Sequence, residues 1–403
     1  MPEATMLPDS HPRLLLVGAG EMGRGYVAAA LLAGLSVGLV ERPARFESYR
    51  DEVATLFPCA GPADQHWIAA TISAARRWQP ASVLAFAEPH VLAAAWAQDM
   101  LGLPGPSLRA AAICRDKALQ RLCLNGSGVD QPEFAVVRNL AEASQFAAGQ
   151  LPVVIKALRS SGSAGVTLVS DSRDLARVLT EYGSHEPVLV ESYVDGPEFS
   201  CEALVHDGAV VFRNYTRKLT AGPPDFVEVG HVLPAAIPRE QRDLFDETVS
   251  RVVESLGIVS SLVHLEFRFA RGRSYIMETA VRTPGDHIME LLSLAYGQDF
   301  FDQVIRLYTG QVPGADYRAR GVSAIRYLEP RPGSFVRVEG FERALNMPGV
   351  VRVSIPQYES GAAIRPLRSS RDRGAYVILQ AESEDEITRR MELLLDTLRV
   401  VTR

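Results

Sequence analysis

Two glutamates in a predicted β-hairpin, Glu266 and Glu278, give the sequence its sharpest chemistry. The period-two pattern of residues 261–269 and 274–282 indicates two strands, and their short loop brings the two carboxylates opposite each other to within one residue of register. Carboxylates this close repel unless a cation lies between them. Mg²⁺ is usually held by one or two carboxylates together with phosphate oxygens. We therefore predict that Glu266 and Glu278 bind Mg²⁺; a cross-strand salt bridge from Glu266 to a neighbouring arginine is the alternative.

Basic residues and a small-residue loop are placed to bind phosphate. Lys156 lies in a strand predicted at residues 152–158, where a buried ammonium needs an anionic partner. A second lysine, Lys117, lies upstream, and Arg282 shares a strand face with Glu278 and can bind a carboxylate or phosphate through its planar guanidinium. A small-residue loop follows the strand at residues 152–158, and its amides can surround phosphate oxygens. Its residues are therefore nucleotide-binding candidates: Ser160, Ser161, Gly162, Ser163 and Gly165. A snorkelling edge-strand lysine and a flexible hairpin are the alternative.

A strand predicted at residues 187–193 ends in a carboxylate and turns through Asp-Gly towards a second carboxylate. We expect Glu191 to lie by an adenine base and Glu198 by ribose hydroxyls, with Tyr193 and Val194 in the intervening nucleotide-binding segment. An ordinary surface turn is the alternative.

The N-terminal region contains a GxGxxG motif, formed by Gly18, Gly20 and Gly23, between a predicted strand and a predicted helix. Glu41 ends the next predicted strand. This is the fingerprint of dinucleotide binding, because the glycines allow close backbone approach and the helix N-terminus favours a diphosphate. The alternative is a tight turn in a Rossmann-like domain that binds another ligand or none, and the downstream motifs favour it.

The order of predicted elements suggests three parts. Strands at residues 13–18, 36–41 and 82–87 alternate with helices, which indicates a parallel α/β sheet. Hairpins mixed with helices follow, including a strong turn signal at Asp207-Gly208. The closing helix opens with a capping box, Ser383 and Glu386. We place the parts at residues 1–113, 114–310 and 311–403.

Composition excludes several classes of function. The net charge of −6 is spread along the 403 residues, so no basic surface for nucleic acid or an anionic membrane is expected. The longest apolar run, residues 27–40, is too short to span a bilayer. The four cysteines have neither paired spacing nor a CxxC motif, which argues against a disulfide framework or a zinc site. We expect a soluble, cytoplasmic protein.

Taken in order, the motifs at Lys117, Lys156, the Ser/Gly loop, residues 191–198 and the carboxylate hairpin resemble the ATP-grasp superfamily of carboxylate–amine ligases. The resemblance covers essentially the whole chain. It implies a mixed α/β and α+β fold, with an N-terminal Rossmann-like domain, a two-part nucleotide clamp and a small C-terminal α+β subdomain. Residues 226–235 look like the bacilysin-type L-amino-acid ligases, in which a histidine matching His231 and an arginine matching Arg282 lie at the substrate site; Gly285 belongs to the same substrate segment.

The resemblance implies an ADP-forming ligase that joins an amino acid or related carboxylate to the amine of an amino acid through an acyl phosphate, in small-peptide or natural-product biosynthesis. ATP and Mg²⁺ are the implied cofactors, the partners are small molecules, and homodimers are common in the family. Arg282 would stabilise the acyl phosphate, Lys218 would reach the γ-phosphate, and His231 would either orient the acceptor carboxylate or handle a proton. Glu88 would meet a substrate ammonium or simply cap the next helix.

One position departs from the superfamily pattern. Many ATP-grasp enzymes read E-x-N-x-R where this chain has Ala280 between Glu278 and Arg282, which removes one expected metal ligand. Two other functions stay open: an NAD(P)-dependent dehydrogenase that uses the N-terminal glycines, and a non-catalytic ATP-binding protein.

Overall fold

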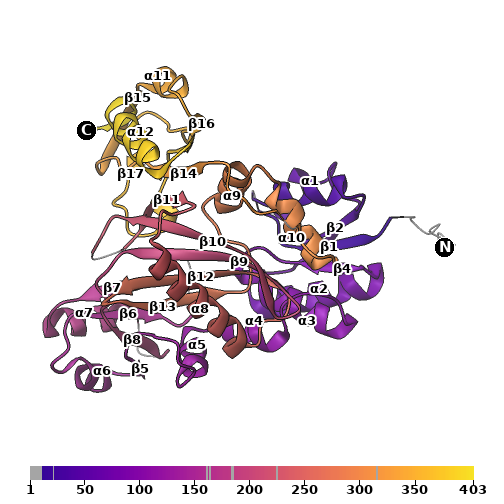
Figure 1. Ribbon diagram of the computed structural model, residues 1–403, viewed down its shortest axis with the longest axis horizontal. Coiled ribbons are helices and arrows are strands. Elements are labelled where there is room, and N and C mark those ends of the chain that lie inside the picture. Colours follow the sequence, from indigo (N-terminus) through magenta and orange to yellow (C-terminus); the bar gives the residue numbers. More distant parts are fainter. Residues whose placement is uncertain are drawn as a thin grey trace.

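The structure of the protein, a computed structural model, describes residues 11–20, 22–159, 162, 165–182, 186–223, 226–314 and 316–403. Three of the predicted phosphate-loop residues, Ser160, Ser161 and Ser163, lie outside these ranges. Figure 1 shows the N-terminal domain (indigo) at one end of the molecule, a small sheet described below at the other, and the C-terminal segment (yellow) above them.

The N-terminal domain is built on a parallel sheet with strand order β3-β2-β1-β4. Its strands are β1 (Arg13–Val17), β2 (Ser36–Glu41), β3 (Thr55–Pro58) and β4 (Ser82–Leu84). Its helices are α1 (Arg24–Leu32), η1 (Pro43–Ser48), α2 (Asp64–Trp78), η2 (Glu88–His90) and α3 (Val91–Leu101). Alternate residues of β1 pack with α1 on one face and with α2 and α3 on the other, as expected for a parallel sheet covered on both faces.

A small antiparallel sheet, which we call the clamp sheet, follows two linking helices, α4 (Leu108–Cys114) and α5 (Lys117–Leu124). The strand order is β5-β8-β6-β7. The elements are β5 (Phe134–Val137), α6 (Leu140–Ala147), β6 (Val153–Ala157), β7 (Val166–Val169), α7 (Ser172–Tyr182) and β8 (Val188–Ser192). Helices α6 and α7 cover one face through apolar residues, and this leaves the face that carries Lys156 and Glu191 for the site described below.

The largest sheet has eight strands in the order β13-β12-β9-β10-β11-β14-β18-β16. Its first five strands in chain order are β9 (Glu198–His206), β10 (Ala209–Thr220), β11 (Glu228–Leu233), β12 (Ser261–Ala270) and β13 (Arg273–Ala280). One face packs on α8 (Arg239–Leu256) through a cluster that includes Phe245, Phe199 and Phe267. Positive φ angles at Asp207 and Gly208 form the turn between β9 and β10, which confirms the predicted hairpin.

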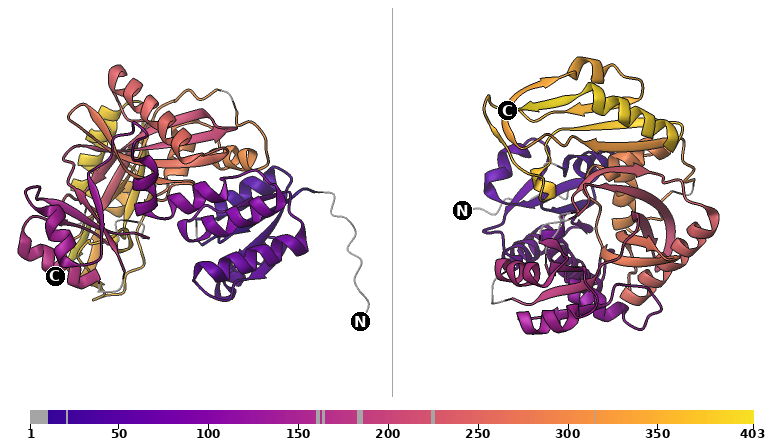
Figure 2. Two further views of the ribbon diagram at one scale, coloured as in Figure 1. Left: turned by 90° about the horizontal axis from the view of Figure 1, so that it is seen from below. Right: turned by 90° about the vertical axis from the view of Figure 1, so that its left-hand side faces the viewer.

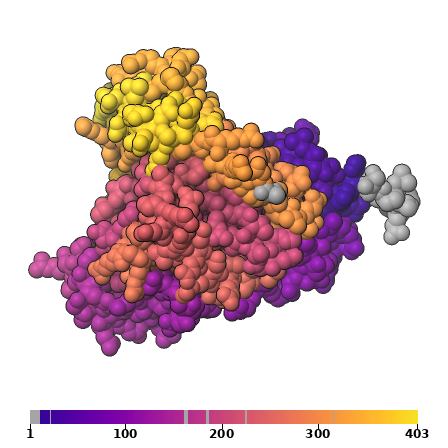
Figure 3. Space-filling model, viewed as in Figure 1, coloured from indigo at the N-terminus to yellow at the C-terminus, as the bar shows by residue number. Residues whose placement is uncertain are grey.

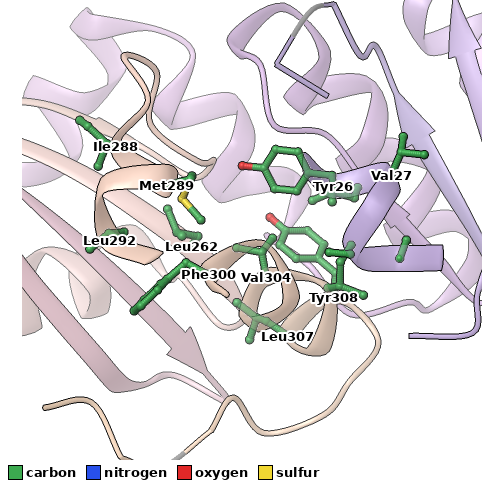
Figure 4. Close-up of a cluster of buried hydrophobic side chains, with 14 of the residues drawn as sticks. Tyr26, Val27, Leu262, Ile288, Met289, Leu292, Phe300, Val304, Leu307 and Tyr308 are labelled. Atoms are coloured by element: carbon green, nitrogen blue, oxygen red, sulfur yellow. The ribbon is translucent and has the colours of Figure 1, made fainter. Parts of the chain in front are cut away.

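Helices α9 (Ile288–Tyr296) and α10 (Phe300–Tyr308) join the N-terminal domain to the large sheet. Figure 4 shows the Tyr26 ring of α1 beside the Tyr308 ring of α10, in one apolar cluster that also includes Val27 and Val304. This core includes residues of both parts, so it joins the N-terminal domain to the large sheet. Figure 2 shows the same arrangement from two further directions.

The C-terminal segment both extends the large sheet and adds a lobe of its own. Strands β14 (Val322–Tyr327), β16 (Val350–Ser354) and β18 (Tyr376–Ala381) extend the sheet. The lobe contains β15 (Gly333–Glu339), α11 (Phe341–Leu345), β17 (Ala363–Ile364), η3 (Ser370–Asp372), α12 (Glu384–Thr397) and β19 (Arg399–Thr402). Figure 3 shows this lobe projecting from the body of the molecule. The predicted boundary at residue 311 falls in the loop after α10, yet the eight-stranded sheet continues across it, so the three-part division stays a prediction.

Element boundaries differ from the predicted ones in a few places. Helix α1 begins at Arg24, whereas the sequence pattern predicts a helix over residues 21–32. Strand β4 ends at Leu84, before the turn that leads to Glu88. In the part of the chain that the structure describes, no helix is both long and apolar enough to cross a membrane.

Candidate active site

One face of the large sheet is polar over its five strands nearest the clamp sheet. Strand alternation places Phe199, Leu265 and their neighbours in the core against α8, and the residues between them on the opposite face. Cross-strand pairing then brings Ser200 opposite Glu266 and Glu202 opposite His264. A row of charged side chains on an otherwise buried sheet requires partners for each of them.

Glu266 and Glu278 are directly opposite each other in the pairing of β12 with β13, which confirms the predicted register. Lys218 Nζ lies 2.9 Å from Glu266 Oε1, and His264 Nε2 lies 3.2 Å from the same oxygen. Lys117 Nζ lies 3.2 Å from Glu278 Oε2. Burial raises the pKa of Glu266, but the charges of Lys218 and His264 outweigh burial and hold this pKa well below its usual range. Both carboxylates are therefore neighbours of cations, and the neighbours of Glu266 are a lysine and a histidine rather than the arginine of the alternative interpretation.

The donor set around these glutamates fits Mg²⁺. Among the described residues, no group of three or more His, Cys, Asp or Glu side chains forms a cage for a metal ion. Ala280 lines the same cavity and offers no ligand. Two carboxylates with open positions suit Mg²⁺, which completes its shell with water and phosphate oxygens rather than with an all-protein cage.

The buried Glu191 carboxylate contacts two cations, Lys156 on the clamp sheet and Arg121 on α5. Lys156 Nζ lies 2.5 Å from one of its carboxylate oxygens, and Arg121 Nε from α5 lies 2.5 Å from the other. Burial raises the pKa of Glu191, but Arg121 and Lys156 outweigh burial and lower this pKa to about 2. Burial lowers the pKa of Lys156, although Glu191 opposes the shift. Lys156 thus has the anionic partner that its buried position required.

Glu198 lies at the opposite wall of the site, at the start of β9. Its two oxygens lie 2.7 Å from Lys218 Nζ and 3.0 Å from Arg268 Nη2. Lys218 also lies 3.3 Å from Glu228, so this one ammonium contacts three carboxylates. Burial lowers the pKa of Lys218, but Glu198, Glu266 and Glu228 outweigh burial and raise this pKa well above its ordinary value.

His264 is a structural cation that the sequence analysis did not single out. Its Nδ1 atom lies 3.1 Å from Glu202, which is fully buried, and its Nε2 atom contacts Glu266. Burial lowers the pKa of His264, but hydrogen bonds to the two glutamates outweigh burial and raise this pKa to about 9. Glu202 also accepts hydrogen bonds from Ser200, Asn214 and Thr216. This network holds the β12 side of the site rigid.

The clamp sheet and the polar face enclose one cavity of about 940 Å³, open solvent included. Ten predicted site residues line the cavity: Lys117, Lys156, Gly162, Glu191, Tyr193, Val194, Glu198, Glu266, Glu278 and Arg282. Residues that sequence reasoning missed also line it, and these include Glu228, His264, Arg268, Phe226 and Met277.

One end of the cavity is apolar and aromatic. The Tyr193 and Phe226 rings are stacked with centroids 5.9 Å apart, and the Arg268 guanidinium lies 4.9 Å from the Phe226 centroid. Val154 and Met277 complete the apolar lining. A flat aromatic base could stack there while its polar tail extends towards the lysines.

A signal present in the sequence could have drawn attention to this cavity. The chain has only three lysines among its 42 lysines and arginines, namely Lys117, Lys156 and Lys218. Two of them line the cavity and the third contacts three of its glutamates. Lysine is a compact point charge that arginine cannot replace in a tight site, so its confinement to this cavity marks the site.

Arg282 contacts Glu88 of the N-terminal domain rather than a metal ligand. Its Nε atom lies 2.6 Å from Glu88 Oε2, and Arg115 Nη1 lies 3.6 Å from the other oxygen. Burial raises the pKa of Glu88, but the charges of Arg282 and Arg115 outweigh burial and lower this pKa. The Glu88 carboxylate therefore forms ion pairs with two arginines. The N-cap residue of η2 is Ala87 rather than Glu88, and no side chain caps this helix. The capping alternative for Glu88 is wrong.

Of the remaining predicted residues, His231 lies outside the cavity lining and forms a buried pair with Asp286, with 2.9 Å between Nε2 and Oδ2. Gly285 precedes Asp286, and a Cβ atom built on Gly285 would meet open space. Gly165 has a φ of +68° at the start of β7, where a side chain would be strained.

The N-terminal glycine motif is already occupied by a side chain of the protein. The amides of Ala19 and Gly20 donate to Glu41 Oε2 at 2.9 and 3.3 Å. A Cβ atom on Gly18 would lie 2.1 Å from the His90 ring. Because the amides that would hold a diphosphate bind Glu41, this turn stabilises the domain itself, and the geometry argues against the dinucleotide interpretation.

Comparison with known proteins agrees with this fold and site. Residues 149–290 match the ATP-grasp domain family. The chain therefore has an ATP-grasp fold, as predicted. Residues 326–403 match L-amino acid ligase C-terminal domain 2.

Three individual proteins illustrate the likeness. An uncharacterized protein of Sinorhizobium fredii is 31% identical over 70% of this chain and 60% of its own length. The chain thus spans less than two thirds of that relative. A D-alanine–D-alanine ligase of Syntrophotalea carbinolica is 27% identical over 51% of this chain and 69% of its own length. The crystal structure of an L-amino acid ligase from Bacillus licheniformis superposes with a TM-score of 0.85 at 21% identity, over 98% of this chain and 99% of that chain.

ATP-grasp ligases use ATP with Mg²⁺, so the match of residues 149–290 to the ATP-grasp domain agrees with the predicted cofactors. The donor set around Glu266 and Glu278 fits the metal, and the aromatic and lysine-lined cavity fits the nucleotide.

Proposed function

We propose that the protein is an ADP-forming ligase that joins the carboxylate of an amino acid or related acid to the amine of an amino acid, through an acyl phosphate. The observation that supports this most directly is the pairing of Glu266 with Glu278 beside Lys117 and Arg282 in one cavity. Bound MgATP would supply the phosphoryl group that activates the carboxylate.

The lysines neutralise phosphate charge in this proposal. Lys117 and Lys156 line the cavity and would hold the α- and β-phosphates, with Gly162 and Gly165 in the loop that covers them. The adenosine would be surrounded by Tyr193, Val194 and Glu198. Glu191 would hold the Lys156 ammonium in place through their ion pair. Lys218 reaches the γ-phosphate only by exchanging one of its carboxylate partners, so we assign it first to holding Glu266 in place.

Arg282 would stabilise negative charge on the acyl phosphate and on the tetrahedral oxyanion that follows. Glu88 contacts it and would aim its guanidinium across the boundary between the N-terminal domain and β13. A fixed guanidinium needs no reorganisation when charge develops, which is the usual source of electrostatic stabilisation in enzymes. Glu88 would serve the substrate ammonium only after releasing Arg282 or Arg115.

Water must be kept from the acyl phosphate, because hydrolysis would waste the nucleotide. The turn at residues 369–373 of the C-terminal lobe reaches the edge of the cavity. The Ser370 amide donates to the Gly162 carbonyl at 3.2 Å, and its hydroxyl donates to Glu228 at 3.2 Å. This contact would help to close the loop over the phosphates.

The test is release of ADP and phosphate in the presence of Mg²⁺ and mixtures of amino acids, with products read by mass spectrometry. We expect turnover that depends on amino acids and a product lighter by one water than the sum of two substrates. ATP binding without turnover in any mixture would instead favour the non-catalytic function. Production of small peptides for natural-product biosynthesis, a cytoplasmic location and a homodimer stay predictions.

A further inference from the structure

Three residues from distant parts of the chain form a buried polar triad beside the cavity. His231 lies on β11, Asp286 lies in the loop after β13, and Arg373 lies just before β18. Arg373 Nη1 and Nη2 lie 2.7 and 2.5 Å from the two oxygens of Asp286, and His231 Nε2 lies 2.9 Å from one of them. Arg373 also donates to the Glu228 carbonyl and covers the Tyr327 ring at 4.1 Å. The triad is thus fixed from both sides.

The ionisation of Asp286 determines which nitrogen of His231 carries a proton. Burial raises the pKa of Asp286, but hydrogen bonds from His231 and Arg373 outweigh burial and hold this pKa well below its usual range. An ionised carboxylate only accepts hydrogen bonds, so Nε2 of His231 must be the protonated nitrogen. In the neutral ring, Nδ1 then has a free lone pair.

That Nδ1 atom is buried and has no hydrogen-bond partner among the residues that the structure describes. His231 itself is only 2% exposed. A buried nitrogen without a partner is costly, and it indicates a partner that arrives with a ligand. Because Nδ1 has a lone pair and no hydrogen, the ligand group must be a donor, as an ammonium is and a carboxylate is not. Of the two roles that the sequence left open for His231, this favours proton handling over orientation of the acceptor carboxylate.

Charged groups on neighbouring elements surround the triad. Arg373 binds both carboxylate oxygens of Asp286, and Lys218 is directly opposed to His231 in the pairing of β10 with β11. The Lys218 ammonium contacts Glu198, Glu228 and Glu266.

We propose that Asp286 and Arg373 are positioning residues that present His231 as the base for the amine substrate. This inference rests on the proposed function. Nδ1 of His231 takes one proton from the ammonium, and the freed nitrogen lone pair attacks the carbonyl carbon of the acyl phosphate. The carbon–oxygen bond to phosphate breaks, and the departing phosphate takes the second proton from nitrogen. The products are the amide, hydrogen phosphate and a protonated His231, which then releases its proton to water.

The experiment compares two nucleophiles in the same enzyme. Hydroxylamine is unprotonated at neutral pH and needs no base, whereas an α-ammonium is still largely protonated there. With ATP, Mg²⁺ and an equimolar mixture of the common amino acids, hydroxamate formation reports carboxylate activation alone. Peptide formation in the same mixture without hydroxylamine reports activation and the base together.

We expect His231→Gln and Asp286→Asn to keep hydroxamate formation within about threefold and to lose peptide formation by 10²-fold or more, since general bases contribute roughly 10²–10⁴-fold. In Asp286→Asn, the new side-chain amide would donate to Nε2 and so move the ring proton to Nδ1. Peptide formation by both variants should recover as pH rises, because free amine becomes available. Arg373→Gln removes the second partner of Asp286 and should lower peptide formation while it keeps hydroxamate formation.

The control is a neighbour outside the triad. His287→Gln, next to Asp286, should change neither rate, because His287 pairs with Glu290 instead. Equal loss of hydroxamate and peptide in the triad variants would show a purely structural role and overturn the inference, as would unchanged peptide rates. Absence of hydroxamate from the wild-type protein would instead refute the proposed function, so the two failures are distinct.

Discussion

The Nζ atom of Lys117 lies 3.2 Å from a carboxylate oxygen of Glu278. Lys117, the first residue of α5, thus contacts a carboxylate of β13. Lys218 makes the same kind of contact with Glu266 on the neighbouring strand, β12. In both pairs a lysine lies beside a carboxylate that we assign to Mg²⁺. When nucleotide and metal bind together, the carboxylates can take the metal and the lysines the phosphates, so each positive charge keeps a negative neighbour.

This exchange predicts that Mg²⁺ and ATP bind cooperatively through Glu278. Glu278→Gln keeps the shape of the side chain but removes the charge that holds the metal. We expect ADP formation to fall by at least 10²-fold and the Mg²⁺ dependence of ATP binding, measured by calorimetry, to weaken. Glu247→Gln is the control, because Glu247 lies on the exposed side of α8 and pairs with Arg251. Wild-type activity in Glu278→Gln would contradict the metal assignment.

A second prediction concerns Arg282. Lysine at this position keeps the positive charge but loses the planar fork that reaches Glu88 and an oxyanion together. Arg282→Lys should lower kcat by roughly 10²–10³-fold, the usual effect of losing an oxyanion donor, with little change in ATP affinity. Arg273→Lys, at the exposed start of the same strand, should behave as wild type. An equal loss in both variants would show that β13 rather than Arg282 had been disturbed.

Acid stability should depend on Glu191. Its folded pKa of about 2 lies below the ordinary value of 4.5, so its contribution is present above pH 4.5 and is lost as pH falls towards 2. The contribution is on the order of 3 kcal/mol for a fully buried group. Glu191→Gln should therefore unfold at lower urea concentration at pH 7 and lose less further stability between pH 4.5 and 3 than the wild type. Glu240→Gln, in the first turn of α8, is the control. Parallel curves for the wild type and Glu191→Gln would count against the buried ion pair.

The confinement of lysine to one site predicts selective protection by nucleotide. Apart from the chain terminus, an amine-directed reagent can modify only Lys117, Lys156 and Lys218. We expect slow labelling of Lys117 and Lys156 without ligands, strong protection by MgATP, and loss of activity in proportion to labelling, all followed by peptide mass spectrometry. Equal labelling rates with and without MgATP would show that the nucleotide binds away from these lysines.

Local patterns predicted part of the site well. The register of Glu266 with Glu278 follows from strand alternation and one short loop, so the sequence alone was sufficient. The apolar strand around Lys156 predicted an anionic partner for this lysine, and Glu191 on the neighbouring strand is that partner. The fold class was predictable for the same reason: each motif lies on a short, recognisable element.

Contacts between distant segments were not predictable from local patterns. Arg282 pairs with Glu88, 194 residues away in the sequence, and Arg373 pairs with Asp286, 87 residues away. No periodicity links such residues, because loops and domain packing decide which ones meet. The glycine motif misled for a related reason: Glu41 reaches back to the turn and takes the amides that a dinucleotide would need.

The most direct test of the account follows one oxygen atom. An amino acid mixture labelled with oxygen-18 in its carboxylates is incubated with the protein, ATP and Mg²⁺, and the released phosphate is analysed by mass spectrometry. Attack of a carboxylate on the γ-phosphate predicts that the phosphate released with each amide carries one oxygen-18 atom and that ADP is the nucleotide product. Unlabelled phosphate, or AMP in place of ADP, would contradict the account.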